Sequence, residues 1–157
     1  RIKDKIHSIY EGSTYTDDVK AYFINKESCI GKRSINELEN TGIYECAVKS
    51  ESYPISILAL YEYSRASLDP NCTGFVNSSC TNYNYFTSIS NGFWTLTADK
   101  DTSYKAYKIS SGSVMISNAS NPAYLLIVIN INGNTVINSE GNGSENNPYI
   151  INMGKTK

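Results

Sequence analysis

Charged residues are scarce in this chain of 157 residues. They make up 18 % of the sequence, and the formal net charge is -1, whereas about 25 % of the residues are charged in typical soluble proteins. Without a basic field to attract phosphates, the sequence argues against nucleic acid as a partner. The longest apolar run, YLLIVI at 124–129, is far shorter than the about 20 residues of a transmembrane helix. We therefore expect membrane attachment only through a segment upstream of Arg1.

Histidine and catalytic motifs are almost missing. His7 is the only histidine, and it lies in an expected N-terminal helix, away from any nucleophile that it would have to activate. The sequence contains no Walker loop, no Rossmann fingerprint, no HExxH and no CxxC pair. DKDTS at 99–103 begins like a calcium loop but lacks its Gly and its closing Glu, so we interpret it as a β-turn. We predict a non-enzymatic protein without cofactor or metal.

Paired carboxylates leave one route to acid–base chemistry open. Three pairs are conceivable: Asp99 with Asp101, Asp17 with Asp18, and Glu62 with Asp69. A turn, a helix start and a solvated helix face, respectively, explain the same residues without catalysis. A hydrolase is therefore the weakest of three functional hypotheses.

Four cysteines indicate the compartment. An even number in a chain rich in Ser and Asn, without metal-ligand spacing, favours disulfides and an extracellular or cell-surface location. Three pairings are possible, of which we prefer the two local ones, Cys29 with Cys46 and Cys72 with Cys80. The alternative is four free, buried thiols. The chain also lacks an initiator methionine and a signal peptide, so we expect it to be the mature part of a longer, exported protein.

Helical patterns dominate the first half. Ile2, Ile6 and Ile9 have helical spacing within 2–11, and the pattern repeats over 16–27 after a break. SINELENTG at 34–42 contains a capping box and ends in Gly42, which predicts a short helix between Cys29 and Cys46. YPISILALYEYSRASLDP at 53–70 predicts a central packed helix that begins near Pro54 and ends at Asp69-Pro70.

Strand patterns dominate the second half. The expected strands are short, β-branched or aromatic, and bounded by turn residues, at 92–99, 104–110, 112–117, 124–132, 134–139 and 148–153. YLLIVI at 124–129 is expected as a central strand buried on both faces, and Asn132-Gly133 as the turn of a hairpin. The last strand, which starts near Pro148, is expected to close the sheet. The pattern as a whole predicts an α+β fold, with helices packed on a mainly antiparallel sheet.

An aromatic patch is the best candidate for ligand binding. Tyr83, Tyr85 and Trp94 lie within a short span and alternate with Asn side chains that can bind hydroxyl groups. Flat rings with a polar atom suit sugars or peptides. For Trp94 the sequence favours the alternative of a core position in its strand; for the two tyrosines neither use is favoured.

Two parts of the chain resemble a known class. DDVKAYFINKESCIGKRSINELENTGIYE, at 17–45, resembles type IV pilin-like and type II secretion pseudopilin-like proteins of Gram-positive bacteria. YPISILALYEYSRASLD, FWTLT and GNGSENNPYII resemble the globular ends of Firmicutes surface proteins, and their arrangement is similar to C-type-lectin-like modules. The resemblance implies a helical extension at 1–28, the stub of a pilin-like helix, and a globular head at 29–157.

The leading hypothesis is an extracellular subunit of a pilus or pseudopilus that displays its head for adhesion. Its expected partners are other pilin-like subunits, bound through an upstream helix, and a glycan or a host surface protein. The rival hypothesis is a free, secreted carbohydrate-binding module of lectin-like type that uses Tyr83, Tyr85 and Trp94.

Overall fold

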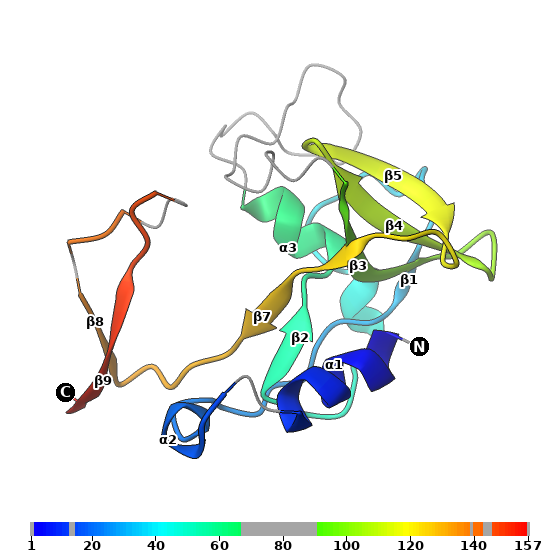
Figure 1. Cartoon of the computed structure of the whole chain (residues 1–157). Coiled ribbons are helices and arrows are strands. Elements are labelled where there is room, and N and C mark those ends of the chain that lie inside the picture. The colour runs from blue at the N-terminus through cyan, green and yellow to red at the C-terminus, as the bar shows by residue number, and fades with distance from the viewer. Residues whose placement is uncertain (1, 13–14, 67–90, 139, 143–145, 157) are drawn as a thin grey trace. The chain divides into compact units, whose positions relative to one another are not determined.

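Helices lie in the first half of the chain and most strands in the second. The structure is a computed structural model that describes residues 2–12, 15–66, 91–138, 140–142 and 146–156 (Figure 1). The α+β class predicted from the sequence is confirmed. The contacts divide the chain into two compact units. Unit 1 consists of 1–26, 53–56 and 129–157, and unit 2 of 27–52 and 57–128.

Unit 2 is built on a sheet with the order β1-β3-β4-β5. The long strands β3 (Phe93–Asp99), β4 (Lys105–Ser110) and β5 (Ser113–Asn118) are antiparallel, whereas the short strands β1 (Lys32–Arg33) and β6 (Tyr124–Leu125) both pair with β3 in parallel. The β4–β5 turn is tight because Ser111 and Gly112 both have positive φ, 48° and 78°, as a two-residue type I′ hairpin requires.

The core of unit 2 lies between the sheet and helix α3 (Leu60–Arg65). Its buried members come from α3, β3 and β4: Leu60, Tyr63, Phe93, Tyr107 and Ile109. The rings of Tyr63 and Phe93 meet edge to face at a centroid distance of 5.9 Å, which is a favoured aromatic geometry. DKDTS at 99–103 is the turn between β3 and β4, as predicted, and the Asp101 N–H donates to Asp99 Oδ1 at 3.3 Å.

Unit 1 contains α1 (Ile2–Glu11), α2 (Asp17–Lys20), β8 (Thr135–Asn138) and β9 (Ile150–Thr156). The predicted helix over 2–11 is confirmed, and it buries Ile6. The helix expected over 16–27 ends at Lys20, because the chain then turns extended and Phe23 forms a β-bridge with Ile131.

The prediction of a central helix over 53–70 is wrong in its first part. Residues Ile55–Ile57 form strand β2, which pairs with β7 (Ile127–Ile129). In each of these two strands the chain crosses from one unit to the other. The helix starts only after Ala59, whose N–H donates to the carboxylate of Glu62 at 2.8 Å. Buried Ile55 and Ile57 alternate with half-buried Ser56, which is the period of a strand rather than a helix. The predicted stop at 69–70 lies outside the described residues.

The short helix predicted at 34–42 is also wrong. The described backbone there forms a turn in which Ser34 N–H donates to the Glu37 carboxylate at 2.8 Å and Glu37 N–H to the Ser34 carbonyl at 3.1 Å. The capping box therefore closes a single turn. The backbone does not continue as a helix after this turn, and the Glu37 carbonyl accepts a hydrogen bond from the Arg33 guanidinium.

Two strand predictions need correction as well. YLLIVI is not one buried strand: it is split into β6 and β7, and its side chains are half-buried or exposed. Leu126, between the two strands, packs against the core of unit 2. The hairpin expected at Asn132-Gly133 does not form. Instead β8 pairs with β9 in a two-stranded sheet of its own, so the C-terminal segment is a hairpin but does not close the main sheet.

Candidate functional site

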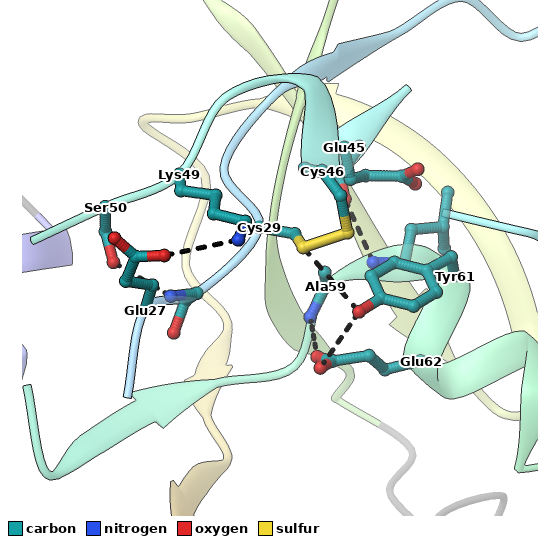
Figure 2. Close-up of a disulfide and its surroundings, with 12 residues drawn as sticks. Glu27, Cys29, Glu45, Cys46, Lys49, Ser50, Ala59, Tyr61 and Glu62 are labelled. Carbon is teal, nitrogen blue, oxygen red and sulfur yellow. Dashed lines mark hydrogen bonds and ion pairs between the residues drawn. A yellow bond between two sulfur atoms is a disulfide. The ribbon is translucent and has the colours of Figure 1, made fainter. Parts of the chain in front are cut away.

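A disulfide locks the segment Glu27–Ser52 of unit 2. Cys29 and Cys46 are bonded, as predicted, and they close a loop with a sequence separation of 17 (Figure 2). Beside the bond the chain forms a narrow antiparallel ribbon, in which Ile30 N–H donates to the Val48 carbonyl and Ser50 N–H to the Ser28 carbonyl, both at 2.9 Å. The ribbon and the disulfide together hold both ends of the loop.

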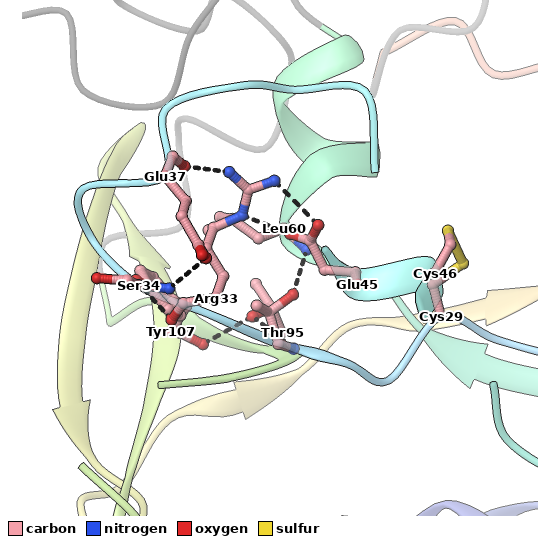
Figure 3. A network of polar contacts seen from close by, with 10 residues as sticks. Cys29, Arg33, Ser34, Glu37, Glu45, Cys46, Leu60, Thr95 and Tyr107 are labelled. Carbon is pink, nitrogen blue, oxygen red and sulfur yellow. Dashed lines mark hydrogen bonds and ion pairs between the residues drawn. A yellow bond between two sulfur atoms is a disulfide. The ribbon is translucent and has the colours of Figure 1, made fainter. Parts of the chain in front are cut away.

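A buried ion pair fixes the inside of this loop (Figure 3). The Arg33 guanidinium donates from Nε and Nη2 to the two carboxylate oxygens of Glu45, each at 2.9 Å, and the side chains are only 1 % and 0 % exposed. The third nitrogen, Nη1, donates to the Glu37 carbonyl, and the ring of Tyr44 lies 5.0 Å from the guanidinium carbon. Buried charges are tolerated when they are paired and hydrogen-bonded in this way.

The same loop is attached to the sheet through backbone groups. The Arg33 carbonyl accepts from Lys100 N–H at 2.9 Å and from the hydroxyl of Tyr107 at 3.2 Å. Burial, with a further contribution from the nearby Asp99, raises the pKa of Tyr107 well above its ordinary value, so this hydroxyl remains a donor. Helix α3 is also attached to β3 by a hydrogen bond, from Leu60 N–H to Thr97 Oγ1 at 2.9 Å.

Two polar contacts near solvent lie beside the buried pair. The carboxylate of Glu37 accepts from Lys100 Nζ at 2.7 Å, and Ser34 Oγ donates to Asp101 at 2.6 Å. The hydrogen bond from Lys100, supported by the one from Ser34 N–H, lowers the pKa of Glu37, and the same contact raises the pKa of Lys100. These groups are near solvent, so they stabilise the loop only weakly.

The segment also carries exposed apolar side chains. Five of the exposed large apolar side chains belong to it: Ile30, Ile35, Leu38, Ile43 and Val48. Ile30 and Val48 lie opposite each other in the ribbon, so their side chains share one face. Exposed apolar groups that share a face can mark interaction sites, and the Ile30–Val48 pair is one such group.

This arrangement can present an apolar surface. The charged groups inside the loop are bonded to one another, and no cluster of three potential metal ligands exists among the described residues. The chemistry available at the exposed side chains Ile30, Ile35, Leu38, Ile43 and Val48 is apolar contact.

Other residues predicted for the site have different places. Trp94 is 5 % exposed in β3, the core position that the sequence favoured for it. Tyr83 and Tyr85 lie outside the described residues, as do Cys72 and Cys80, so the aromatic ligand surface and the second disulfide stay predictions.

Each described carboxylate of the three predicted pairs belongs to a turn or to a helix start. Asp99 and Asp101 belong to the β3–β4 turn, Asp17 and Asp18 begin α2, and Glu62 caps α3. Asp69 lies outside the described residues.

Sequence reasoning missed Arg33 and Glu45, the centre of the site. Each is a common surface residue type, and their separation of twelve positions matches no motif. One signal was available: with few charges in the chain, an Arg and a Glu inside one predicted disulfide loop are candidates for pairing.

Comparison with known proteins gave no match of any kind: no protein family, no curated protein and no solved structure is significantly similar to the chain. No helix in the described part of the chain is long and apolar enough to cross a membrane.

Proposed function

We propose that this chain is a non-enzymatic, extracellular protein, the head of a subunit in a pilus or pseudopilus-like surface assembly, which contacts its partners through Glu27–Ser52. One observation carries the proposal: the segment that is fixed by the Cys29–Cys46 bond and the buried Arg33–Glu45 pair also presents exposed apolar side chains. Disulfides persist in oxidising compartments, and a rigid apolar surface loses little entropy on binding.

The expected partners are neighbouring subunits, together with a glycan or protein of a host surface. The pilin-like character expected for 17–45 is part of this proposal, and that stretch contains most of the disulfide-locked loop. The exposed apolar residues Ile35, Leu38 and Ile43 lie within the resembling stretch.

Fractionation of the organism that produces the protein tests the proposal. Cells are sheared, and the chain is detected with a specific antibody in surface, membrane and cytosolic fractions. We expect the chain in the sheared surface fraction, with Cys29 and Cys46 oxidised. Recovery in the cytosol with both thiols reduced would overturn the proposal.

A pair of variants then tests the contact surface. Leu38→Ser combined with Ile43→Ser should reduce recovery in the sheared fraction without changing the unfolding transition, because both side chains are exposed, at 51 % and 62 %. Tyr104→Ser, at an equally exposed site outside the segment, is the control. Equal recovery of all three proteins would remove Glu27–Ser52 as the contact surface.

A second candidate is the secreted carbohydrate-binding module. The aromatic rings of unit 1 support it: His7 stacks on Tyr53 at a centroid distance of 4.0 Å, and Tyr10 meets Tyr53 edge to face at 5.4 Å. These rings are half-buried, and the Tyr53 hydroxyl donates to Glu11 at 3.2 Å. Glycan-array binding that Tyr53→Ala removes would assign the ligand to this cluster, whereas loss in Tyr83→Ala or Tyr85→Ala would assign it to the patch predicted from the sequence. A blank array for the wild type counts against this candidate.

A further inference from the structure

In the described part of the chain, the outer edge of β5 lacks three features that often protect a sheet edge: a proline, a charged residue and a bulge. Among the described strands, β5 pairs with β4 on one side and with no strand on the other. Its register with β4 is unbroken from Ser113 to Asn118, so no bulge twists the edge away. No proline or charged residue interrupts it, and the sequence from Ile109 to Ser139 contains no charged residue at all. Natural edge strands normally use at least one of these devices against pairing.

The direction of the backbone groups along this edge follows from the β4–β5 ladder. Ala119 N–H donates to the Tyr104 carbonyl at 2.9 Å, which makes the two residues a hydrogen-bonded pair. Because such pairs alternate along an antiparallel ladder, the odd-numbered residues of β5 bond to β4. Val114 and Ile116 therefore direct their N–H and C=O groups to the free edge. The carbonyl of Asn118 already accepts from Asn121 N–H at 2.9 Å.

We propose that two copies of this chain associate through their β5 strands, antiparallel around a two-fold axis at Met115. In this register Val114 pairs with Ile116 of the partner subunit, and Ile116 with Val114 of the partner subunit. Each pair exchanges both of its backbone hydrogen bonds. A two-fold interface needs such a self-complementary surface, in which one residue contacts a second and the second contacts the first.

The side chains fit a second copy as well as the backbone does. Met115 is 46 % exposed, and at the axis the two methionines form a non-hydrogen-bonded pair, in which side chains lie closest together. Val114 and Ile116 already pack against the core of unit 2, so the pairing continues that apolar face into the partner. The uncharged edge also brings no like charges together at the axis. The inference does not depend on the proposed function.

Cysteine cross-linking tests the register. Met115→Cys should form a covalent dimer under mild oxidation, because the Cα atoms of a non-hydrogen-bonded pair are about 4.5 Å apart, within the range of disulfides. Ser117→Cys alone should form none, since its own counterpart lies roughly 13 Å away along the strand. A mixture of Ser113→Cys and Ser117→Cys should cross-link, because these positions are opposite in the proposed register. Non-reducing electrophoresis reads out each case, with the wild type as the blank.

Charge variants test the association itself by sedimentation velocity across micromolar to sub-millimolar concentrations. The wild type should form dimers, and Met115→Lys should be monomeric with an unchanged circular dichroism spectrum, because two like charges would face each other at the axis. An equimolar mixture of Met115→Lys and Met115→Glu should restore the dimer, and Tyr104→Lys, exposed but outside the strand, should leave it intact. A monomeric wild type, or a Met115→Lys protein that still dimerises, overturns the proposal.

Discussion

At the scale of single residues, the Arg33–Glu45 pair is the most consequential contact of unit 2. Both side chains are fully enclosed and bonded to each other through two hydrogen bonds of 2.9 Å. Removal of one partner leaves the other charge buried and uncompensated, which costs more than the pair itself contributes.

We expect Glu45→Gln to lower the free energy of unfolding by about 3–5 kcal/mol, because it strands the Arg33 charge without changing the volume. Urea unfolding at neutral pH measures the change. Glu27→Gln is the matched control, since it removes an exposed ion pair with Lys49 that is worth about 0–1 kcal/mol. A loss for Glu45→Gln as small as that of the control would show that the buried pair is not needed.

The titration of Glu37 gives a second prediction at this scale. Its pKa is held below the ordinary 4.5, chiefly by the hydrogen bond from Lys100. Since the folded pKa is the lower one, the stability linked to this carboxylate is complete above about pH 4.5 and is lost as the pH falls through the folded pKa. Carbon-13 NMR of the Glu37 carboxyl should give a midpoint below 4.5, and Lys100→Met should move it upward. An unchanged midpoint in that variant would contradict the assignment.

At the scale of elements, the segment between Cys29 and Cys46 folds as an irregular loop instead of the helix predicted over 34–42. The Glu37 carboxylate accepts from Ser34 N–H and closes one turn, and the Glu37 carbonyl accepts from the Arg33 guanidinium. The loop between Cys29 and Cys46 is therefore held by its cross-link, its buried ion pair, the ribbon at its ends and the pairing of β1 with β3, without a helix of its own over 34–42.

Replacement of both Cys29 and Cys46 by Ser should lower the free energy of unfolding by about 3 kcal/mol, as the chain-entropy model gives for a loop of this length. The substitution leaves Cys72 and Cys80 unchanged, which simple reduction would not do. Urea unfolding compares the variant with the oxidised wild type. A loss below about 1 kcal/mol would show that the ion pair and the ribbon hold the loop without the bond.

The β4–β5 turn offers a stabilising change. Ser111 has a φ of 48°, a conformation that costs non-glycine residues free energy and that asparagine adopts more readily. Ser111→Asn should therefore raise the free energy of unfolding by roughly 0.5–1 kcal/mol, as thermal unfolding can show. Gly112→Ala, which places a Cβ at a φ of 78°, should act in the opposite direction, and a gain there would contradict the turn assignment.

At the scale of the whole molecule, low charge is the dominant property. With a net charge of -1 and a pI near 5.8, the chain has little electrostatic repulsion between copies at neutral pH. We expect its solubility to be lowest near the pI and to increase on either side, as precipitation with ammonium sulfate over a pH series would show. A minimum far from the pI would indicate that apolar association rather than net charge governs solubility.

The division into two units can be compared with the domain boundary predicted from the sequence. The boundary expected at 28/29 lies close to the first crossing between units, at 26/27, and the assignment of domains stays a prediction. The grouping of residues 129–157 with the N-terminal part depends on bridges such as Phe23 with Ile131. Such pairings join positions more than a hundred residues apart, and local periodicity contains no information about them.

The sequence by itself predicted the α+β class, the helix over 2–11, strands at 92–99, 104–110 and 112–117, and the turn at 99–103, all of which the structure contains at nearly these positions. It also favoured the Cys29–Cys46 bond among the possible pairings, and that bond is present. These features depend on contacts within a few residues or on the closure of one short loop. Only the tertiary structure decided that Ile55–Ile57 is a strand, that β8 pairs with β9, and that Arg33 meets Glu45. The physical reason is that a hydrogen-bond partner or a counter-charge from a distant segment outweighs a local preference of about 1 kcal/mol or less per residue.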